Sequence, residues 1–407
     1  MLLKKSLPMI SSVSTLLGLL LFASASVAAP VRILADTHFL NSLGIKPISS
    51  DSELNLSIAE VSEYQANTIS HSAHSFKKCG GFERLQESDS DVYASFDLMH
   101  YQQSQATAYT FLGNPTPPVT KKPTILAATQ QVSETNLREM VTWLSAFQTR
   151  SHRGPENNKH VEDLAARATQ LLANLPYPHQ IDLIEHHDTT QKSLRVRLVG
   201  KDRPNEVVVL GGHLDSINGP IPAAKAPGAD DNASGSSNIF EALRIVSTQE
   251  QPSRTIEFFW YAGEESGLLG SAEIAQSYKQ SHIDVVGVLQ LDMTLFPGEG
   301  EMILGDIADY TNPWLRSYMR SLNDNYIGAQ WKESECGYAC SDHASWHRQG
   351  YAAVMPFEAS LGTMNSNIHT NKDIITPVLN FKHSAAFAKL AVAFALDYSN
   401  STLRPSF

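Results

Sequence analysis

The chain has 407 residues, of which 42% are hydrophobic and 18% are charged, and its formal net charge is −11. Such a composition is typical of a globular protein with one large apolar core or two smaller ones. The acidic balance and the lack of a basic stripe argue against nucleic acid as a partner.

The N-terminus has the pattern of a secretory signal peptide. Two lysines precede an apolar run at 16–22, and the small residues Ser26 and Ala28 follow at the spacing of a cleavage site. A membrane anchor is the alternative, but the run is short and rich in serine for a segment that spans a bilayer. We therefore expect residues 1–28 to be removed after Ala28, and the chain to be secreted and not bound to a membrane.

The next part of the chain differs in composition from the rest. Residues 29 to about 110 are rich in Ser, Gln and His, and the segment 113–124, GNPTPPVTKKPT, is rich in proline and has no acidic residue. The second segment is typical of an extended, exposed linker, where proteases cut. We predict that residues 29–124 are a propeptide with its linker, and that 125–407 form the main domain. A permanent N-terminal domain is the alternative.

The chain has three cysteines, Cys79, Cys336 and Cys340. An exported protein can form disulfides, and Cys336 and Cys340 are close enough in sequence to bridge. Cys79 would then be left over, and an odd thiol in a secreted chain needs an explanation. Removal of the segment that carries Cys79 would supply one.

Regular patterns of apolar residues begin after the linker. We expect helices at 133–147, 160–175, 234–246, from 270 onward and at 381–398, and strands at 193–200, 206–215, 255–261, 285–292 and 352–357. Strands that alternate with helices indicate an α/β fold. Its mixed, largely parallel central sheet would be flanked by helices on both faces.

Acidic residues and histidines follow the predicted strands or lie in nearby loops. They are His213, Asp215, Asp230, Asp231, Glu264, Glu265, Asp292 and His369. In open α/β sheets, ligands bind beyond the carboxyl ends of the strands. We therefore expect these side chains to converge at one edge of the sheet.

Converging carboxylates would raise one another's pKa values unless a cation lay between them. Histidine and carboxylate ligands without thiolates suit catalytic zinc. Taken singly, each residue has a simpler explanation, since Asp230, Asp231 or Asn232 could cap the following helix and His213 could be a core histidine. Five candidate ligands exceed what one tetrahedral zinc needs, which favours two metals that share a carboxylate.

The adjacent pair Glu264 and Glu265 fits such a centre. A water activated by two metals needs a general base that is not itself a ligand, and the pair can supply one residue for each task. Asp215 is the nearest candidate to accept the second N–H of His213, as carboxylates near metal-bound imidazoles usually do.

Seven motifs together resemble one family. They are GGHLDS, APGADDNASG, YAGEESGLLGS, LQLDMT, CGYACSDHASW, MPFE and NIHTNKD. In order and approximate spacing, residues 132–407 are similar to the secreted bacterial leucyl aminopeptidases of the co-catalytic di-zinc exopeptidases. The resemblance implies the zinc-exopeptidase, phosphorylase/hydrolase-like fold, with 125–407 as the catalytic domain.

The resemblance also implies two Zn²⁺ ions per chain and the residues that bind them. The ligands would be His213, Asp231, Glu265, Asp292 and His369. Asp231 would bridge the ions, His213 and Asp292 would complete one site, and Glu265 and His369 would complete the other. The peptide bond from Asp231 to Asn232 would be cis.

Further roles follow from the same likeness. Glu264 would be the general base and acid, and Tyr338 would help to stabilise the tetrahedral intermediate. Cys336 and Cys340 would form the disulfide of the family. Residues 29–124 would assist folding and restrain activity until they are removed, as in a zymogen.

An apolar pocket for the substrate side chain is implied as well. Its wall would be formed by Met293, Ile307, Tyr338, Met355, Phe357, Leu361, Met364 and Ile368. Such a wall fits leucine or another large apolar N-terminal residue. Leu361 and Met364 stand where the family has aromatic residues, and core packing is the alternative role for every member of the set.

The resemblance thus predicts a secreted metallo-aminopeptidase, monomeric, that acts on peptides with a free N-terminus. Four alternatives require other features. A carboxypeptidase on this fold should present arginine to the substrate carboxylate, and no arginine stands beside the metal motifs. A single-zinc glutaminyl cyclase, or a binding domain that has lost its metals, should lack at least one of the five ligands. A serine hydrolase would need a G-x-S-x-G turn after a strand, and no such turn follows a predicted strand.

Overall fold

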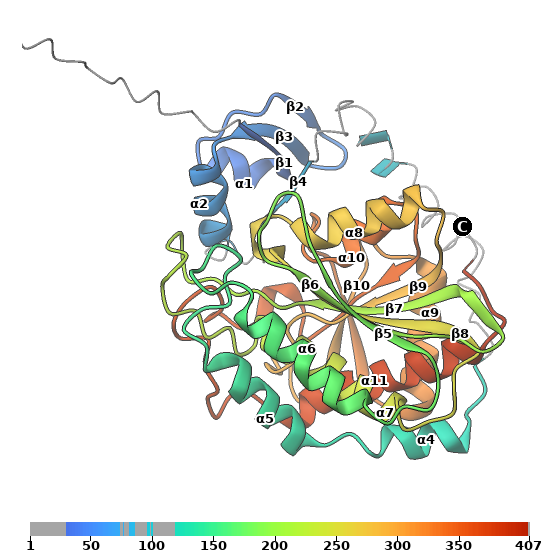
Figure 1. Cartoon of the computed structure of the whole chain (residues 1–407). Coiled ribbons are helices and arrows are strands. Elements are labelled where there is room, and N and C mark those ends of the chain that lie inside the picture. Colours follow the sequence, from blue (N-terminus) through green and yellow to red (C-terminus); the bar gives the residue numbers. More distant parts are fainter. Residues whose placement is uncertain are drawn as a thin grey trace, which may run out of the picture.

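The computed structural model describes residues 30–73, 76, 81–85, 96–97, 99–100 and 119–405. The predicted signal peptide, Cys79 and the first half of the proline-rich linker, 113–118, lie outside these residues. Figure 1 shows two parts, a large α/β body and a small N-terminal sheet that lies against it.

The body is built around a six-stranded sheet with the order β12-β9-β7-β8-β6-β5. The strands are β5 (His179–Ile184), β6 (Ser193–Leu198), β7 (Arg203–His213), β8 (Arg254–Tyr261), β9 (Asp284–Gln290) and β12 (Ala353–Val354). The four strands β12, β9, β7 and β8 run parallel, whereas β6 is antiparallel to both of its neighbours, β8 and β5. The prediction of a mixed, largely parallel sheet is confirmed.

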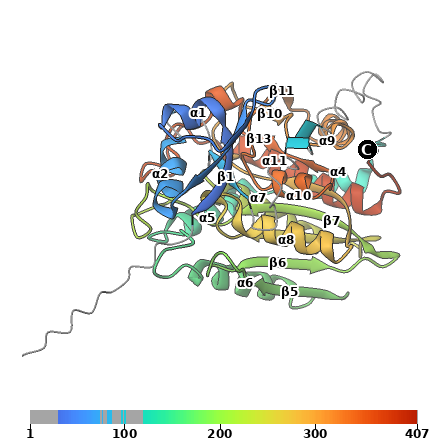
Figure 2. The same ribbon diagram turned by 90° about the horizontal axis from the view of Figure 1, so that it is seen from above.

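Helices cover both faces of this sheet (Figures 1 and 2). On one face the core includes α4 (Pro123–Thr129), α5 (Glu134–Ser145), α6 (Lys159–Leu172), α7 (Ala233–Val246), α9 (Pro313–Tyr326) and α11 (Phe381–Asn400). On the other face lie α8 (Leu269–Gln280) and α10 (His343–Arg348). The five helices expected from the sequence are present, with bounds shifted by a few residues.

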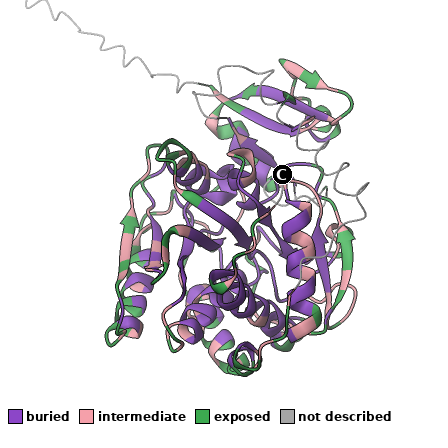
Figure 3. Ribbon diagram, turned by 90° about the vertical axis from the view of Figure 1, so that its right-hand side faces the viewer, coloured by how far each residue is buried: buried purple, intermediate pink, exposed green. Residues whose placement is uncertain are grey.

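The central strands are buried on both faces, as Figure 3 shows. In β7, Val208 and Leu210 pack into the core beneath α7 and α11, whereas Val207 and Val209 pack toward α8. This is why the strand is a continuous apolar run in the sequence and not an alternating one.

A smaller sheet, with the order β11-β10-β13, flanks the main one. Its strands are β10 (Ile303–Ile307), β11 (Gln330–Ser334) and β13 (Pro356–Phe357). The single strand predicted at 352–357 is therefore wrong. Ala353–Val354 pairs with β9 in the main sheet, and Pro356–Phe357 pairs with β10 in the small one. Met355, between them, is where the chain changes sheets.

The N-terminal part is a four-stranded antiparallel sheet with the order β2-β3-β1-β4. It comprises β1 (Val31–Asp36), α1 (Thr37–Ser42), β2 (Ser49–Asp51), β3 (Leu56–Val61), α2 (Glu63–Ala73) and β4 (Phe82–Arg84). Its helices and strands share a core of their own, which includes Ile33, Phe39 and Ile69. We call this part the N-terminal sheet. None of these helices and strands was predicted from the sequence.

The chain rejoins the body just before α4. The backbone N–H of Lys122 donates to the hydroxyl of Tyr326 (2.9 Å), and its ammonium lies 2.9 Å from Asp397 Oδ2. Val119 packs against the main core. Among the described residues, no helix is long and apolar enough to cross a bilayer.

Candidate active site

The adjacent glutamates lie in a tight turn where β8 ends. A short 3₁₀ helix, η2 (Glu264–Ser266), stands between Gly263 and Gly267, whose φ angles are +61° and +95°. Glycine adopts such angles without the strain that a Cβ would add. Glu264 is 2% exposed and Glu265 is 1% exposed, so this pair is not at a solvated corner.

Asp215 fixes this turn from the neighbouring strand. One of its oxygens accepts the N–H of Glu264 (3.0 Å) and the other accepts the N–H of Glu265 (3.3 Å). Nδ1 of His213 lies 3.4 Å from Asp215 Oδ1. A single carboxylate therefore orients both the imidazole at the end of β7 and the glutamate turn after β8.

The histidines and acids form two sets that share one carboxylate. Nε2 of His213 lies 3.1 Å from Asp231 Oδ1 and 3.2 Å from Asp292 Oδ1. Nε2 of His369 lies 3.1 Å from the other oxygen, Asp231 Oδ2, and 2.8 Å from Glu265 Oε2. The structure thus brings together all five residues that the sequence singled out at this edge.

This arrangement fits metal ions. Single atoms of His213, Asp231 and Glu265 lie within 4.8 Å of one another, close enough for all three to belong to one metal centre. Within the described part of the chain, Oε2 of Glu264 and Oε1 of Glu265 are buried and accept no hydrogen bond. Buried carboxylate oxygens without hydrogen-bond donors are costly, and a bound cation would offset that cost.

Burial dominates the electrostatics of the glutamate pair. It raises the pKa of Glu265 to about 7, with the nearby charge of Asp231 adding to the shift and His369 opposing it. Burial likewise raises the pKa of Glu264 well above its ordinary value, while the imidazole of His213 opposes the shift. A carboxylate with a raised pKa binds a proton more readily, which suits a general base.

The loop that carries Asp231 is held by hydrogen bonds to its backbone. The carboxylate of Asp373 accepts the N–H of Asp230 and of Asp231, both at 3.0 Å. Asn232 caps α7 by accepting the N–H of Gly235 (2.9 Å), so the capping alternative holds for that residue. The peptide bond between Asp231 and Asn232 is cis, as the resemblance implies.

Asp230 has a structural role next to Asp231. Its carboxylate accepts the N–H of Leu295 and the side-chain amide of Asn365, both at 2.9 Å. It therefore ties the loop before α7 to the segment after β9 and to the segment that carries Asn365.

A fully buried arginine, Arg150, lies behind the site. Its guanidinium donates to the carbonyls of Leu144 (3.0 Å), Leu214 (2.8 Å), Pro227 (2.6 Å) and Gly228 (2.9 Å). Burial lowers its pKa to about 10, which leaves it charged at neutral pH. Its donors are engaged by backbone, so it is not presented to a substrate carboxylate.

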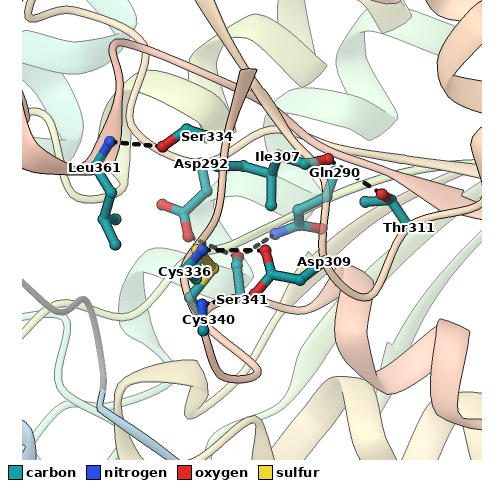
Figure 4. Close-up of a disulfide and its surroundings, with 11 residues drawn as sticks. Gln290, Asp292, Ile307, Asp309, Thr311, Ser334, Cys336, Cys340, Ser341 and Leu361 are labelled. Carbon is teal, nitrogen blue, oxygen red and sulfur yellow. Dashed lines mark hydrogen bonds between the residues drawn. A yellow bond between two sulfur atoms is a disulfide. The ribbon is translucent and has the colours of Figure 1, made fainter. Parts of the chain in front are cut away.

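Tyr338 lies in a loop closed by the disulfide between Cys336 and Cys340. The hydroxyl of Ser341, which follows this loop, donates to Asp292 Oδ2 (2.6 Å) (Figure 4). At the other end, the carboxylate of Asp309 accepts two backbone N–H groups. The disulfide implied by the resemblance is present. Through Ser341 the loop is bonded to Asp292, one of the five histidines and carboxylates that converge here, which we call the histidine–carboxylate group.

The residues of the predicted pocket gather in one apolar cluster. Its members from the body include Met293, Ile307, Tyr338, Met355, Phe357, Met364 and Ile368, with Leu361 packed against them on η3 (Leu361–Thr363). The N-terminal sheet contributes to the same cluster through Leu34, Leu56, Ile58 and Leu85. The pocket wall is thus covered by the N-terminal sheet.

The N-terminal sheet also contacts the glutamate turn itself. The hydroxyl of Ser70 donates to the backbone carbonyl of Glu265 (2.6 Å). Nε of Arg84 donates to the carbonyl of Ser266 (2.8 Å), and its backbone N–H donates to the carbonyl of Gly267 (3.2 Å). Three successive carbonyls of the turn therefore bind the N-terminal sheet.

Comparison with known proteins assigns the family. The profile of peptidase family M28 matches residues 194–395. A probable leucine aminopeptidase of Trichophyton verrucosum (strain HKI 0517) is 36% identical over 318 residues, which cover 76% of this chain and 85% of that relative. The chain belongs to peptidase family M28.

Solved structures agree with this assignment. The LapA aminopeptidase of Legionella pneumophila resembles this M28 peptidase with a TM-score of 0.77 at 27% identity, over 91% of this chain and 99% of the LapA chain. A glutaminyl cyclase of Porphyromonas gingivalis has a TM-score of 0.52 at 14% identity and covers 66% of this chain and 98% of its own. At that identity the likeness is one of fold alone.

Several residues that shape this site were not found from the sequence. Arg150 and Asp309 act on backbone groups, so nothing in the spacing of side chains indicates them. Asp373 offered a signal, because it lies four residues after His369 in the motif NIHTNKD.

Proposed function

We propose that this M28 peptidase is an exported, monomeric di-zinc aminopeptidase that removes large apolar residues from the N-termini of peptides. One observation carries the proposal. Asp231 turns its two oxygens toward two different histidines, each at 3.1 Å, and each histidine has a second carboxylate within 3.2 Å. Two half-sites that share a carboxylate are what a two-metal hydrolase requires.

We divide the five proposed ligands between two ions as the resemblance implies. His213, Asp231 and Asp292 would hold one ion, and His369, Asp231 and Glu265 would hold the other. When bound, the ions would polarise the scissile carbonyl and make a water nucleophilic near neutral pH.

The remaining steps depend on residues of the chain itself. Glu264 would take a proton from the attacking water and later deliver it to the leaving amine. Its buried carboxylate, with an oxygen that accepts no hydrogen bond from the described residues, supports this role. Tyr338 would stabilise the oxyanion of the tetrahedral intermediate.

The apolar cluster supports the substrate preference. Methionine, isoleucine and phenylalanine side chains form its part in the body, so a large apolar N-terminal side chain would be desolvated there. Each buried methylene contributes roughly 0.8 kcal/mol, which favours leucine over alanine at this position.

We also propose that the N-terminal sheet keeps the enzyme inactive until it is removed. Leu34, Leu56 and Ile58 pack into the cluster that would bind the substrate side chain. A peptide and the N-terminal sheet could not occupy that surface together. Because Val119 and Lys122 contact the body, a cut upstream of Val119 would release the sheet without disturbing them.

A panel of aminoacyl anilides tests the activity. The protein should hydrolyse leucyl and similar anilides, lose this activity with a chelator, and contain close to two zinc ions per chain. Activity that resists the chelator, or a lack of activity on every substrate with a free amine, would overturn the proposal. Conversion of a peptide that begins with glutamine to the pyroglutamyl peptide, with release of ammonia, would instead indicate a cyclase.

The role of the N-terminal sheet is tested with the same substrates. Full-length protein and protein cut upstream of Val119 should differ in activity, with the full-length form the slower. Equal activity of the two forms would remove the inhibitory role and leave the sheet as a permanent domain.

A further inference from the structure

The carboxylate of Asp309 supports the loop of Tyr338. Asp309 lies two residues beyond the end of β10, at Ile307. One of its oxygens accepts the N–H of Cys336 (3.0 Å), and the other accepts the N–H of Gly337 (2.7 Å). Figure 4 shows its carboxylate directed at the start of the disulfide loop. A carboxylate that accepts two adjacent amides is a strong, directional anchor.

The anchor itself is held in place. The hydroxyl of Thr311 donates to the carbonyls of Ile307 (3.1 Å) and Ala308 (2.7 Å). The N–H of Ala308 donates to the carbonyl of Ser334 (2.9 Å), which continues the pairing of β10 with β11. Asp309 therefore extends from a fixed strand end and not from a loose loop.

The far end of the loop has a different support. The hydroxyl of Ser341 donates to Asp292 and in turn lies 3.1 Å from the side-chain amide of Gln290. The short disulfide loop is thus suspended between Asp309 at one end and Asp292 at the other. Tyr338 stands midway and is 1% exposed, so a shift of either end moves its ring.

We propose that Asp309 is a positioning residue that holds the Tyr338 hydroxyl where the oxyanion of the tetrahedral intermediate forms. This inference rests on the proposed function, in which Tyr338 stabilises that oxyanion. Preorganised donors are effective because they need no rearrangement as the charge develops. Asp309 touches neither the substrate nor the histidine–carboxylate group, and it acts through the loop alone.

The Asp309→Asn variant tests the proposal. Its amide can accept one N–H, but its NH₂ group would face the second, so one end of the loop loses a support. We expect kcat for leucyl anilide to fall on the order of tenfold or more, with KM changed less than twofold and zinc content unchanged. Asp309→Glu keeps the charge and should recover part of kcat, which guards against failure of the first variant to fold.

Asp306→Asn is a matched control. Asp306 lies in β10, the strand that precedes Asp309, and it is fully buried; it pairs with Arg316 (3.0 Å) and with Arg320 but does not bond to the disulfide loop. This variant should lower thermal stability and leave kcat near that of the wild type. An equal loss of kcat in both variants would mean that Asp309 acts through general stability, and would overturn the proposal.

A double-mutant cycle with Tyr338→Phe gives the decisive result. If Asp309 acts through the tyrosine hydroxyl, Asp309→Asn should cost little further kcat in the Tyr338→Phe background. Additive losses would contradict the inference. All measurements use whichever form of the chain, full-length or processed, is active on the anilides.

Failure of the inference can be told apart from failure of the proposed function. A slow Tyr338→Phe variant with a fully active Asp309→Asn variant refutes only the role of Asp309. A fully active Tyr338→Phe variant refutes the role of the tyrosine and with it this inference. Absence of hydrolysis by the wild type refutes the aminopeptidase itself.

Discussion

Two adjacent glutamates at the end of β8 differ in what surrounds each carboxylate. Glu265 Oε2 lies 2.8 Å from Nε2 of His369, whereas the imidazole nearest to Glu264 is that of His213, at 3.9 Å. Their backbones are held alike by Asp215. The environment of each side chain, and not its position in the turn, is what separates a proposed ligand from a proposed base.

Alanine variants separate the two proposed roles. Glu264→Ala should retain both metal ions and lose roughly 10²–10⁴-fold in kcat, as expected on removal of a general base. Glu265→Ala should lose metal, which elemental analysis after dialysis would detect. Glu162→Ala, an exposed change on α6, is the control and should behave as the wild type. Unchanged zinc in Glu265→Ala, or full turnover in Glu264→Ala, would refute the respective assignment.

A buried imidazole far from the proposed metals gives the fold a dependence on pH. Burial lowers the pKa of His160 to about 3, and the charge of Arg150 adds to this. Below about pH 6.5 the His160 imidazole therefore binds a proton in the unfolded chain but stays neutral in the folded chain. The contribution of His160 to stability should fall by about 1.4 kcal/mol per pH unit as the pH drops from 6.5 toward 3.

Urea unfolding of the wild type and of His160→Gln across that range measures the effect. The difference in free energy of unfolding between the two should shrink as the pH falls. A difference that stays constant with pH would show that His160 titrates alike in both states.

At this scale the sequence predicted the residues that converge and missed those that position them. His213, Glu265 and their partners could be found because ligand chemistry limits which side chains can act, and strand ends limit where they stand. Arg150 could not, since it binds four carbonyls and every residue of any type supplies a carbonyl.

Among the elements, the parallel strands carry the site. His213 ends β7, the glutamates follow β8, and Asp292 follows β9, and these three strands are neighbours in the sheet. The long apolar runs made them predictable. The two-residue strands β12 and β13 were not, because a run of six apolar residues contains no mark of the point at which the chain leaves one sheet for another.

Arg150→Lys tests how the loops around these strands are held. Lysine has three donors on one nitrogen and cannot reach four carbonyls in the plane of a guanidinium. Loss of these bonds to buried carbonyls should lower the free energy of unfolding by about 1–3 kcal/mol.

The measurement is the urea midpoint, with Arg167→Lys as the control. Arg167 stacks on Trp143 at the surface, 4.0 Å from the ring centroid, and its replacement should cost less than about 0.5 kcal/mol. Equal effects of the two substitutions would contradict the importance of the buried carbonyl contacts.

At the scale of the whole molecule, two separate cores meet over the proposed site. The N-terminal sheet has its own core and also shares the pocket cluster. Its strands are short, and its sequence is polar and mixed, so its helices and strands were not predicted from the sequence. The contact surface depends on residues far apart in the chain and could not be predicted from either part alone.

Arg84→Ala should weaken the binding of the N-terminal sheet to the glutamate turn. The variant loses the bond to the carbonyl of Ser266 and the pair with Glu63, so the full-length protein should hydrolyse leucyl anilide several-fold faster. Arg32→Ala is the control, because Arg32 pairs with Glu60 at the exposed side of the same sheet. Equal activity of the two variants would mean that these contacts do not restrain the enzyme.

The N-terminal sheet is synthesised before the residues of the proposed active site. Domains made early in synthesis can fold before later ones emerge, and residues 30–85 precede His213 by more than a hundred positions. The N-terminal sheet, with its local pairing and separate core, can be complete when the glutamate turn first appears. The peptidase body of a nascent chain would then fold in contact with an N-terminal sheet that has already folded. The proposed substrate pocket would be covered from the time at which it forms.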